Sequence, residues 1–316
     1  MNNLHFALCF DENYAQYASV CIRSIADCHK NDKIIIHAIS DNLPDKKKNR
    51  LRINCENPNC ILQFHIVSDK CIQKLPTNIW PIHAWYRILL PDILPDSVEK
   101  VLYLDCDTLV TANLKHLYEI DLENKVFAAV EDPQSYEDST YKRCGFPKKY
   151  GYVCSGVMMF NLKVWRKEKI KDQLIDYALI NKDKIKFPDQ DCLNSLYYER
   201  KEILPFKYGM MDAFFMNKEI LRKMPIHLVK EGLDQPSIIH YASSAPWIRE
   251  FRPSIFSKEW DKVNKSLKYQ AKIKYHSRGI KFVKMMTYKI LHPFKTFRKE
   301  KARLTKTKAY GLLKSL

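Results

Sequence analysis

Two carboxylates that follow an apolar run are the residues of this chain whose types and spacing most clearly suggest chemistry. In the segment VLYLDCDTLV, which begins at Val101, Asp105 and Asp107 come directly after four apolar or aromatic residues. Because residues i and i+2 of an extended chain point to the same side, both carboxylates could converge on one hard divalent cation while Cys106 points away. The simpler alternative is a solvated Asp-x-Asp turn, since only a buried carboxylate needs a partner.

Polar residues also stand next to other predicted strands, and we regard them as candidates for the same site. They are Asp11, Asn13, the Asp189-Gln190-Asp191 triplet and His240. Parallel strands end at one edge of an open α/β sheet, where such sheets bind ligands, so these side chains can meet in one cleft. Two carboxylates and an imidazole are suitable ligands for Mn²⁺, with Mg²⁺ possible, and they leave positions for phosphate oxygens. A cation held there would neutralise charge on a leaving diphosphate.

These candidates also have structural alternatives. Asp11 and Asn13 could simply cap the helix that follows them. Asp189 and Asp191 could be favourable charges at the N-terminus of another helix. His240, on an apolar strand, could be a hydrogen-bonded core histidine.

The order of the apolar segments predicts an α/β protein with a mainly parallel sheet, because strands alternate with helices. The predicted strands are 4–9, 33–39, 61–67, 101–104, 126–130, 152–160 and 237–241. The predicted helices are 17–28, a Lys/Arg-rich segment ending near 55, 83–90, 161–181 and 192–199. Gly156, inside a predicted strand, indicates a close approach of backbone or ligand. The polar stretch 133–151 is predicted to be a mobile loop over the site.

Composition bounds the class of protein. The chain has 316 residues, of which 46% are hydrophobic, enough for a substantial core. It has seven glycines and neither a phosphate-binding loop nor a dinucleotide fingerprint, which disfavours those nucleotide enzymes. The ten cysteines form no Cys-x-x-Cys pair, so we expect reduced thiols and no zinc site. We recognise no signal peptide or transmembrane segment and expect a cytoplasmic protein.

The positive charge is concentrated at the C-terminal end. Residues 262–316 hold 17 of the 53 Lys and Arg and one of the 36 acids, which leaves 36 basic and 35 acidic residues in the rest of the chain. Apolar residues interleave with the cations, as in segments that bind anionic membrane surfaces. A merely solvated tail and a nucleic-acid-binding tail are the alternatives, but no nucleic-acid-binding module is recognisable, so no nucleic acid is expected.

Six segments in a fixed order carry a family resemblance that spans about residues 4–250. They are FALCFDENY, YRILLPDIL, KVLYLDCDTLV, YVCSGVMMFNLKVW, FPDQDCLN and IIHYASSAPW. The chain thereby resembles glycosyltransferase family 8, the retaining enzymes that include bacterial lipopolysaccharide galactosyl- and glucosyltransferases and glycogenin. The resemblance implies a GT-A fold, which we assign to 1–260, and UDP-galactose or UDP-glucose as the donor. The basic amphipathic pattern of 261–316 separately predicts a helical, membrane-associating tail.

The resemblance also implies roles for individual residues. Donor binding would fall to Asp11, Asn13, Tyr14, Arg87, Asp105, Cys154 and Ser155, and Mn²⁺ binding to Asp105, Asp107 and His240. Asp189 would bind hydroxyls of the transferred sugar, and Gln190 would lie near the reactive face of the anomeric carbon. Because Gln is a poor nucleophile, front-face attack is favoured over a covalent intermediate. Outside the family pattern, Arg87 could simply pair with Asp92.

Two departures from the family pattern concern the donor. Cys154 stands where the family usually has Asn, a residue that contacts the donor sugar, so the sugar is left open. In the last motif Ser243 replaces a glycine and the family's phosphate-binding lysine is absent. Arg249 or Arg252 could replace its charge, or the enzyme could depend more on the metal.

The sequence therefore predicts a metal-dependent retaining glycosyltransferase that adds an α-linked hexose to a lipopolysaccharide or lipooligosaccharide. Its acceptor would be a lipid-linked saccharide, presented at the inner face of the cytoplasmic membrane where the basic tail docks. The alternatives are a catalytically impaired family member that acts as a membrane-bound adaptor, and a transferase for a protein or capsular acceptor.

Overall fold

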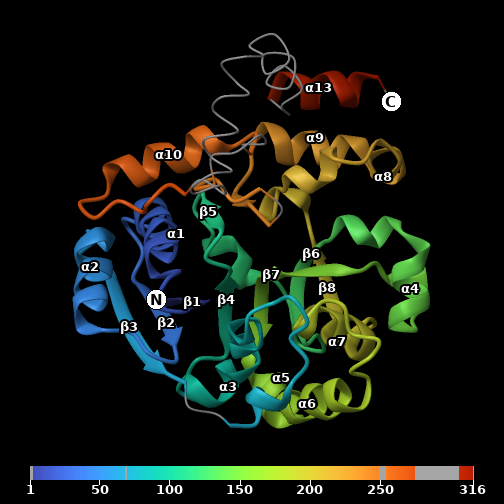
Figure 1. Cartoon of the computed structure of the whole chain (residues 1–316), viewed down its shortest axis with the longest axis horizontal. Helices are drawn as coiled ribbons and strands as arrows, with labels where there is room; N and C mark the ends of the chain where they lie inside the picture. The colour runs from blue at the N-terminus through green and yellow to red at the C-terminus, as the bar shows by residue number, and fades with distance from the viewer. Residues whose placement is uncertain (1–2, 68–69, 243, 249–253, 275–305, 316) are drawn as a thin grey trace, which may run out of the picture.

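A seven-stranded sheet in the order β3-β2-β1-β4-β7-β6-β8 forms the centre of the molecule (Figure 1). The computed structural model describes residues 3–67, 70–242, 244–248, 254–274 and 306–315. The strands are β1 Leu4–Cys9, β2 Ile34–Ser40, β3 Cys60–Ile66, β4 Lys100–Leu104, β6 Phe127–Glu131, β7 Val153–Asn161 and β8 Lys201–Leu204. All neighbours are parallel except that β7 is antiparallel to both β4 and β6. The mainly parallel sheet is thus confirmed.

Helices cover both faces of this sheet. The α-helices are α1 Ala15–Cys28, α2 Asp45–Cys55, α3 Leu90–Ile93, α4 Asp138–Cys144, α5 Leu162–Lys167, α6 Ile170–Ile180, α7 Pro188–Tyr197, α8 Lys218–Lys223, α9 Ile226–Asp234, α10 Ser257–Ser266 and α13 Lys306–Lys314. Short 3₁₀ helices lie at Ile72–Lys74, Ile82–Leu89, Lys115–Glu119, Pro133–Tyr136, Lys148–Tyr150, Phe206–Tyr208 and Asp212–Phe215. In the part of the chain that the structure describes, none of the helices is both long and apolar enough to cross a bilayer.

Alternation along each strand explains the two cores. In β4, Leu102 and Leu104 pack with α1, α2 and α8–α10, whereas Val101 and Tyr103 pack with α3 and α5–α7 on the other face. A strand that is buried on both faces reads as a continuous apolar run, which is why β4 could be recognised in the sequence. β3, at the edge, alternates between half-buried and exposed residues instead.

Several predicted elements differ from those observed. The segment 133–151 contains α4 and two 3₁₀ helices, where a loop had been predicted. Helix α7 begins at Pro188, four residues before the predicted start, because proline lacks the N–H that the first turn leaves unpaired. The segment 83–90 is mostly a 3₁₀ helix.

The predicted late strand does not join the central sheet. β9 (Ile238–His240) pairs antiparallel with β5 (Thr108–Val110), the strand that immediately follows the two carboxylates. This small second sheet carries His240 to the end of β4. Its pairing is the reason that residues more than 130 positions apart share one site.

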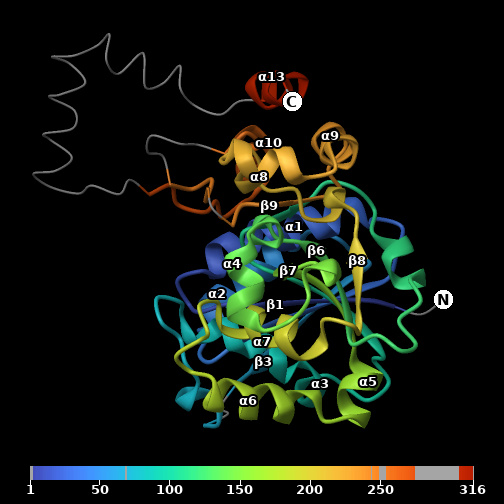
Figure 2. The ribbon, with the colours of Figure 1, turned by 90° about the vertical axis from the view of Figure 1, so that its right-hand side faces the viewer.

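The C-terminal segments described by the structure pack against the body. Trp260 of α10 is buried in the core next to α1, so α10 crosses the domain boundary predicted at residue 260. Ala309 and Leu313 of α13 are buried against α9, and the views in Figures 1 and 2 agree on this arrangement. Residues 275–305, which hold most of the predicted amphipathic tail, lie outside the described residues.

Candidate active site

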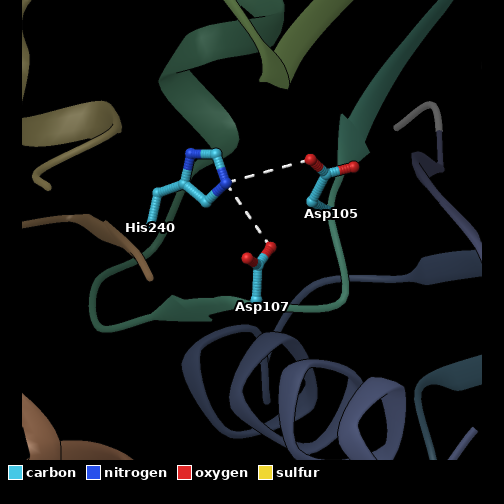
Figure 3. Close-up of side chains that lie close together, drawn as sticks. All are labelled: Asp105, Asp107 and His240. Atoms are coloured by element: carbon cyan, nitrogen blue, oxygen red, sulfur yellow. Dashed lines mark ion pairs between the residues drawn. The ribbon is translucent and has the colours of Figure 1, made fainter. Parts of the chain in front are cut away.

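Asp105, Asp107 and His240 converge at the end of β4 (Figure 3). The imidazole Nε2 of His240 lies 3.8 Å from Asp105 Oδ2 and 3.4 Å from Asp107 Oδ1. His240 is placed by its pairing with Thr108 and by its own N–H, which donates to the Met210 carbonyl at 2.9 Å. The next residue, Tyr241, donates its N–H to the Asp107 carbonyl at 2.8 Å. The backbone around Asp107 is thus hydrogen-bonded to the segment that carries His240.

These three side chains fit a divalent cation. One ligand atom from each lies within 4.8 Å of the others. Ligands at about 2.1 Å from an octahedral cation are roughly 3 to 4 Å apart, so the observed spacing suits Mn²⁺ or Mg²⁺. Although burial lowers the pKa of His240, the Asp107 carboxylate raises it further, and the pKa ends well above its usual value. For Asp107, burial raises the pKa, but the neighbouring His240 lowers it more, so the pKa of this carboxyl ends below its usual value.

The absence of a side chain at Gly156 of β7 allows the three candidate metal ligands to lie close to one another. A Cβ atom at this position would lie 2.2 Å from His240 Cε1 and 2.7 Å from Asp105 Oδ2. Its carbonyl oxygen accepts from the Asp105 N–H at 2.8 Å. The close approach predicted at this glycine is confirmed, and the groups that approach are the candidate metal ligands.

Arg87 connects the carboxylates to the neighbouring elements. Its Nη2 lies 3.0 Å from Asp105 Oδ1 and its Nε 3.3 Å from Asp189 Oδ2, while Nη1 donates to the Ser155 carbonyl. The guanidinium also lies over the Tyr103 ring, 4.4 Å from its centroid. Burial lowers the pKa of Arg87, but the two carboxylates raise it more, so the charge is retained. The alternative pair with Asp92 does not form, because that residue pairs with Lys171 at 2.5 Å.

The three polar residues of the α7 triplet have three different environments. Asp189 faces Arg87, and burial raises the pKa of its carboxyl while Arg87 opposes the rise. Asp189 Oδ2 is buried, and it has an ion-pair contact but no hydrogen-bond partner among the described residues. Gln190 accepts from the Ser155 N–H at 3.0 Å and donates to the Tyr152 hydroxyl at 3.1 Å. Both Asp189 and Gln190 line a pocket that also contains Asp105, Asp107 and His240.

Asp191 is committed to the structure instead. It pairs with Arg143 and accepts from the Tyr152 hydroxyl at 2.6 Å. Its Oδ2 also accepts from the N–H groups of Lys186 and Phe187, at 2.7 and 3.0 Å, ahead of the helix. The role of a helix N-terminal charge, considered from the sequence, therefore fits Asp191 and not Asp189.

Asp132 was missed by the sequence analysis. It follows β6 and lines the same pocket as Asp105 and His240. The Gln190 amide donates to its Oδ2 at 3.4 Å, and burial raises the pKa of its carboxyl. The available signal was its position: like Asp105, it is an acid placed directly after a buried strand.

Two adjoining pockets meet at the candidate metal ligands. The larger, of about 320 Å³, is lined by Asp105, Asp107, His240 and the start of α7. The smaller, of about 200 Å³, is lined by Asp11 and Tyr14 and shares several walls with the first, namely Trp80, Ala84, Arg87, Asp105 and Asp107. Together they offer an elongated site with carboxylates at its middle.

The turn after β1 divides its residues between two places. Asp11 lines the smaller pocket and also accepts the Tyr14 N–H at 2.7 Å, so it stabilises the start of α1 as well. Asn13 lines another cavity, between α1 and α2, and not these pockets. The structure therefore gathers Asp11 and Tyr14 at the site but leaves Asn13 outside it.

Two of the departures noted in the sequence have different outcomes. Cys154 lines the larger pocket, and its Sγ lies 3.8 Å from His240 Nδ1, where it packs behind the imidazole. The next residue, Ser155, uses its backbone: its carbonyl accepts from Arg87 and its N–H donates to Gln190. Ser243, Arg249 and Arg252 lie outside the described residues.

Comparisons with known proteins identify sequences that are similar over most of this chain. The family model described as Glycosyl transferase family 8 matches residues 5–250. A lipopolysaccharide 1,2-glucosyltransferase of Escherichia coli is 30% identical over 244 residues, which cover 75% of this chain and 71% of that protein. General stress protein A of Bacillus subtilis is 24% identical over 77% of this chain and 87% of its own length.

Solved structures show the same fold. The crystal structure of the galactosyltransferase LgtC with donor and acceptor sugar analogues has a TM-score of 0.72 at 22% identity, and the match covers 89% of this chain and 99% of that one. The glycosyltransferase GlyE of Streptococcus pneumoniae has a TM-score of 0.65 at 21% identity, over 83% of this chain and 60% of that chain. The predicted GT-A fold is confirmed.

Proposed function

The chain belongs to glycosyltransferase family 8 and is a glycosyltransferase, and from this premise we propose that it transfers galactose or glucose from a UDP-sugar, with retention of configuration, to a lipopolysaccharide or lipooligosaccharide. The observation that carries the proposal is the convergence of Asp105, Asp107 and His240 beneath Gly156, beside a pocket lined by Asp189 and Gln190. The lipopolysaccharide glucosyltransferase of E. coli, similar over most of its length, supports the acceptor class.

We expect the donor to lie along the two pockets. Asp11 and Tyr14 line the smaller pocket, which suits the uridine, while the metal ligands stand between the pockets, where the diphosphate would lie. A divalent cation bound by Asp105, Asp107 and His240 would neutralise the charge that develops on the departing UDP. Asp189 lines the larger pocket, where Arg87 holds its carboxylate in place, and it would accept from a sugar hydroxyl.

The environments of the α7 residues support front-face attack. A covalent intermediate needs a nucleophilic side chain, such as a carboxylate, at the anomeric carbon, where we expect Gln190 to lie. Gln190 presents an amide whose oxygen already accepts from the Ser155 N–H. Asp191 is held by Arg143, Tyr152 and two backbone N–H groups, so it would have to leave four partners before it could act as a nucleophile.

Membrane association through 261–316 is part of the proposal and has its own test. Since Trp260 and α10 are packed in the core, truncation at 260 would disturb the fold. We therefore keep the full chain and replace Lys281, Lys284, Lys289 and Lys295 by Gln. Co-sedimentation with anionic vesicles is expected to fall, because each cation near such a surface contributes about 1 kcal/mol. Equal pelleting of both proteins would contradict membrane docking by this segment.

A panel of UDP-sugars with Mn²⁺, scored for UDP release, tests the enzymatic proposal. Turnover is expected with UDP-galactose or UDP-glucose, and Asp107→Asn should reduce it about 100-fold or more. Asp138→Asn, at an exposed carboxylate outside the pocket, is the matched control and should keep full activity. Absence of both turnover and binding with every donor would contradict the proposed function.

A further inference from the structure

A second polar cavity lies on the other side of the turn that follows β1. Its volume is about 300 Å³, and it is enclosed by α1, α2 and the segment 269–272. It shares no lining residue with the two pockets of the candidate active site. Figure 1 shows α1 and α2 side by side, with the segment after α10 running above them.

The cavity has a buried polar floor. The Asn54 amide donates to the Ser19 hydroxyl oxygen at 2.7 Å and to the Tyr269 carbonyl at 2.9 Å, and Asn54 Oδ1 accepts from the Tyr269 N–H at 3.0 Å. Ser19 is only 3% exposed and Asn54 only 1%. Among the described residues the Ser19 hydroxyl finds no acceptor, so a buried donor is left at the floor of the cavity.

The rim of the cavity is cationic. Lys47 is paired with Glu12 at 2.8 Å, which leaves Arg50 and Lys272 as the uncompensated charges of the lining. Within the described part of the chain neither has a carboxylate within ion-pair distance. The Arg50 guanidinium lies over the Tyr269 ring, 5.1 Å from its centroid, and the Lys272 N–H donates to Gln16 Oε1 at 2.9 Å. The Arg50 side chain and the Lys272 backbone are therefore held near the opening.

We propose that this cavity binds a phosphomonoester group, carried either by a soluble sugar phosphate or by a lipid head group. A phosphomonoester carries a charge near −2 and three strong acceptor oxygens, which matches two uncompensated cations and the unused hydroxyl donor of Ser19. A cavity of this size holds more than a bare phosphate, so it has room for the attached sugar or glycerol. The proposal does not depend on the identity of the transferred hexose.

The position of the cavity connects it to the candidate active site. Glu12 and Asn13 line the cavity, while Asp11 and Tyr14, their immediate neighbours, line the pocket assigned to the uridine. A ligand in the cavity therefore contacts the same turn from the opposite side. Asn13 thus lines the new site and not the candidate active site.

Calorimetric titration of the full chain with glucose 6-phosphate tests the proposal. Saturable binding is expected for the unaltered protein. Arg50→Gln and Lys272→Gln should each weaken it about tenfold or more, since each removes a charge-assisted hydrogen bond. Ser19→Ala should weaken it about threefold. Lys46→Gln, which removes the same charge from an exposed position of α2 outside the cavity, is the matched control and should change the affinity less than twofold.

A parallel titration with phosphatidylcholine vesicles that contain phosphatidic acid identifies the source of the phosphate. It uses the full chain with Lys281, Lys284, Lys289 and Lys295 replaced by Gln as the background, so that binding through the basic tail is reduced. If a lipid supplies it, Arg50→Gln and Lys272→Gln weaken vesicle binding and glucose 6-phosphate displaces the protein from the vesicles. If a soluble molecule supplies it, the two variants lower only the affinity for glucose 6-phosphate. The proposal is overturned if the unaltered protein binds neither probe, or if both variants bind both probes as tightly as it does; because both residues are exposed, such results would not stem from misfolding.

Discussion

The molecule has two regions rich in charge, and they differ in whether the charged side chains are buried and paired. Around Arg87 the charges are buried or half-buried, and each has a partner of opposite sign, since Asp105 and Asp189 lie within 3.3 Å of the guanidinium. Around Arg50 and Lys272 the cations are exposed, and none of the described carboxylates pairs with them. The cation of the first region is thus paired without a ligand, and the cations of the second are not paired with any described carboxylate.

The difference follows from the cost of desolvation. A charge removed from water costs several kcal/mol unless it is paired and hydrogen-bonded, so the buried cluster has to satisfy itself as it folds. Its geometry is then fixed before any substrate arrives, which is what electrostatic stabilisation of a reaction requires. Exposed cations remain solvated, and they gain a fixed partner only when an anion binds.

The same substitution in the two regions measures this difference. Arg87→Met would leave the Asp105 and Asp189 carboxylates without their cation, and we expect the free energy of unfolding to fall by about 3–5 kcal/mol. Urea denaturation measures this change. Arg87→Lys, which keeps the charge but loses the planar fork that reaches Asp105, Asp189 and the Ser155 carbonyl, should recover only part of the loss. A loss below about 1 kcal/mol for Arg87→Met would show that the buried cluster does not depend on its cation.

Gly156→Ala tests the crowding within the buried region. The added methyl group would force His240 and Asp105 apart, and we expect Mn²⁺ affinity, measured by electron paramagnetic resonance, and sugar transfer each to fall about 100-fold or more. The matched control is Gly311→Ala in α13, where a Cβ meets nothing within 4 Å, and which should be neutral or slightly stabilising. Unchanged Mn²⁺ affinity in Gly156→Ala would mean that the three side chains do not bind the metal together.

The parts of the active site that could be predicted from the sequence are those with a local signature. An apolar run followed by Asp105 and Asp107 is visible in ten residues, and His240 ends another apolar run. The position of Gly156 inside a strand was also a local signal. Each of these inferences needed only the periodicity of one segment.

The parts that could not be predicted depend on how separate segments meet. Arg87 was expected to contact the donor, but its contacts with Asp105 and Asp189 depend on three segments far apart in the chain. Asn13 was grouped with Asp11 by proximity in sequence, yet a tight turn sends the two to different cavities. Asp132 had the same position after a strand as Asp105, but no partner in the sequence to mark it.

Lys201 provides an intermediate case, a buried cation for which the described residues supply no carboxylate within ion-pair distance. Its ammonium donates to the Gly151 carbonyl at 2.7 Å and to Asn194 Oδ1 at 3.0 Å, and burial lowers its pKa to about 7. Asn194 in turn donates to the Gln190 carbonyl at 2.9 Å, so Lys201 supports the start of α7. Among the described residues, the hydrogen-bond acceptors of Lys201 are neutral oxygens, whereas Arg87 faces two carboxylates.

Lys201→Met should therefore change how stability depends on pH. The folded protein releases the lysine proton near pH 7, whereas the unfolded chain keeps it to about pH 10.5, so the unfolded state binds more protons between these values. Stability of the unaltered protein should rise with pH across this window, by up to about 1.4 kcal/mol per unit from this group, and be lost as pH falls towards 7. Urea denaturation at pH 7, 8 and 9 should show this rise diminished in Lys201→Met, and parallel profiles for the two proteins would contradict it.

Arg50→Met should have the smallest effect, and its sign should depend on salt. The residue is exposed on a helix that also carries Lys46, Lys47, Lys48 and Arg52. Removing one of several like charges relieves repulsion at low ionic strength, while the contact with the Tyr269 ring is lost, so the free energy of unfolding should change by less than about 1 kcal/mol. At 1 M salt the screening length is about 3 Å and only the lost ring contact remains, so the variant should then be slightly less stable. Urea denaturation at both salt concentrations separates the two contributions, and a loss comparable to that of Arg87→Met at any salt would show that the exposed cations are held by fixed partners after all.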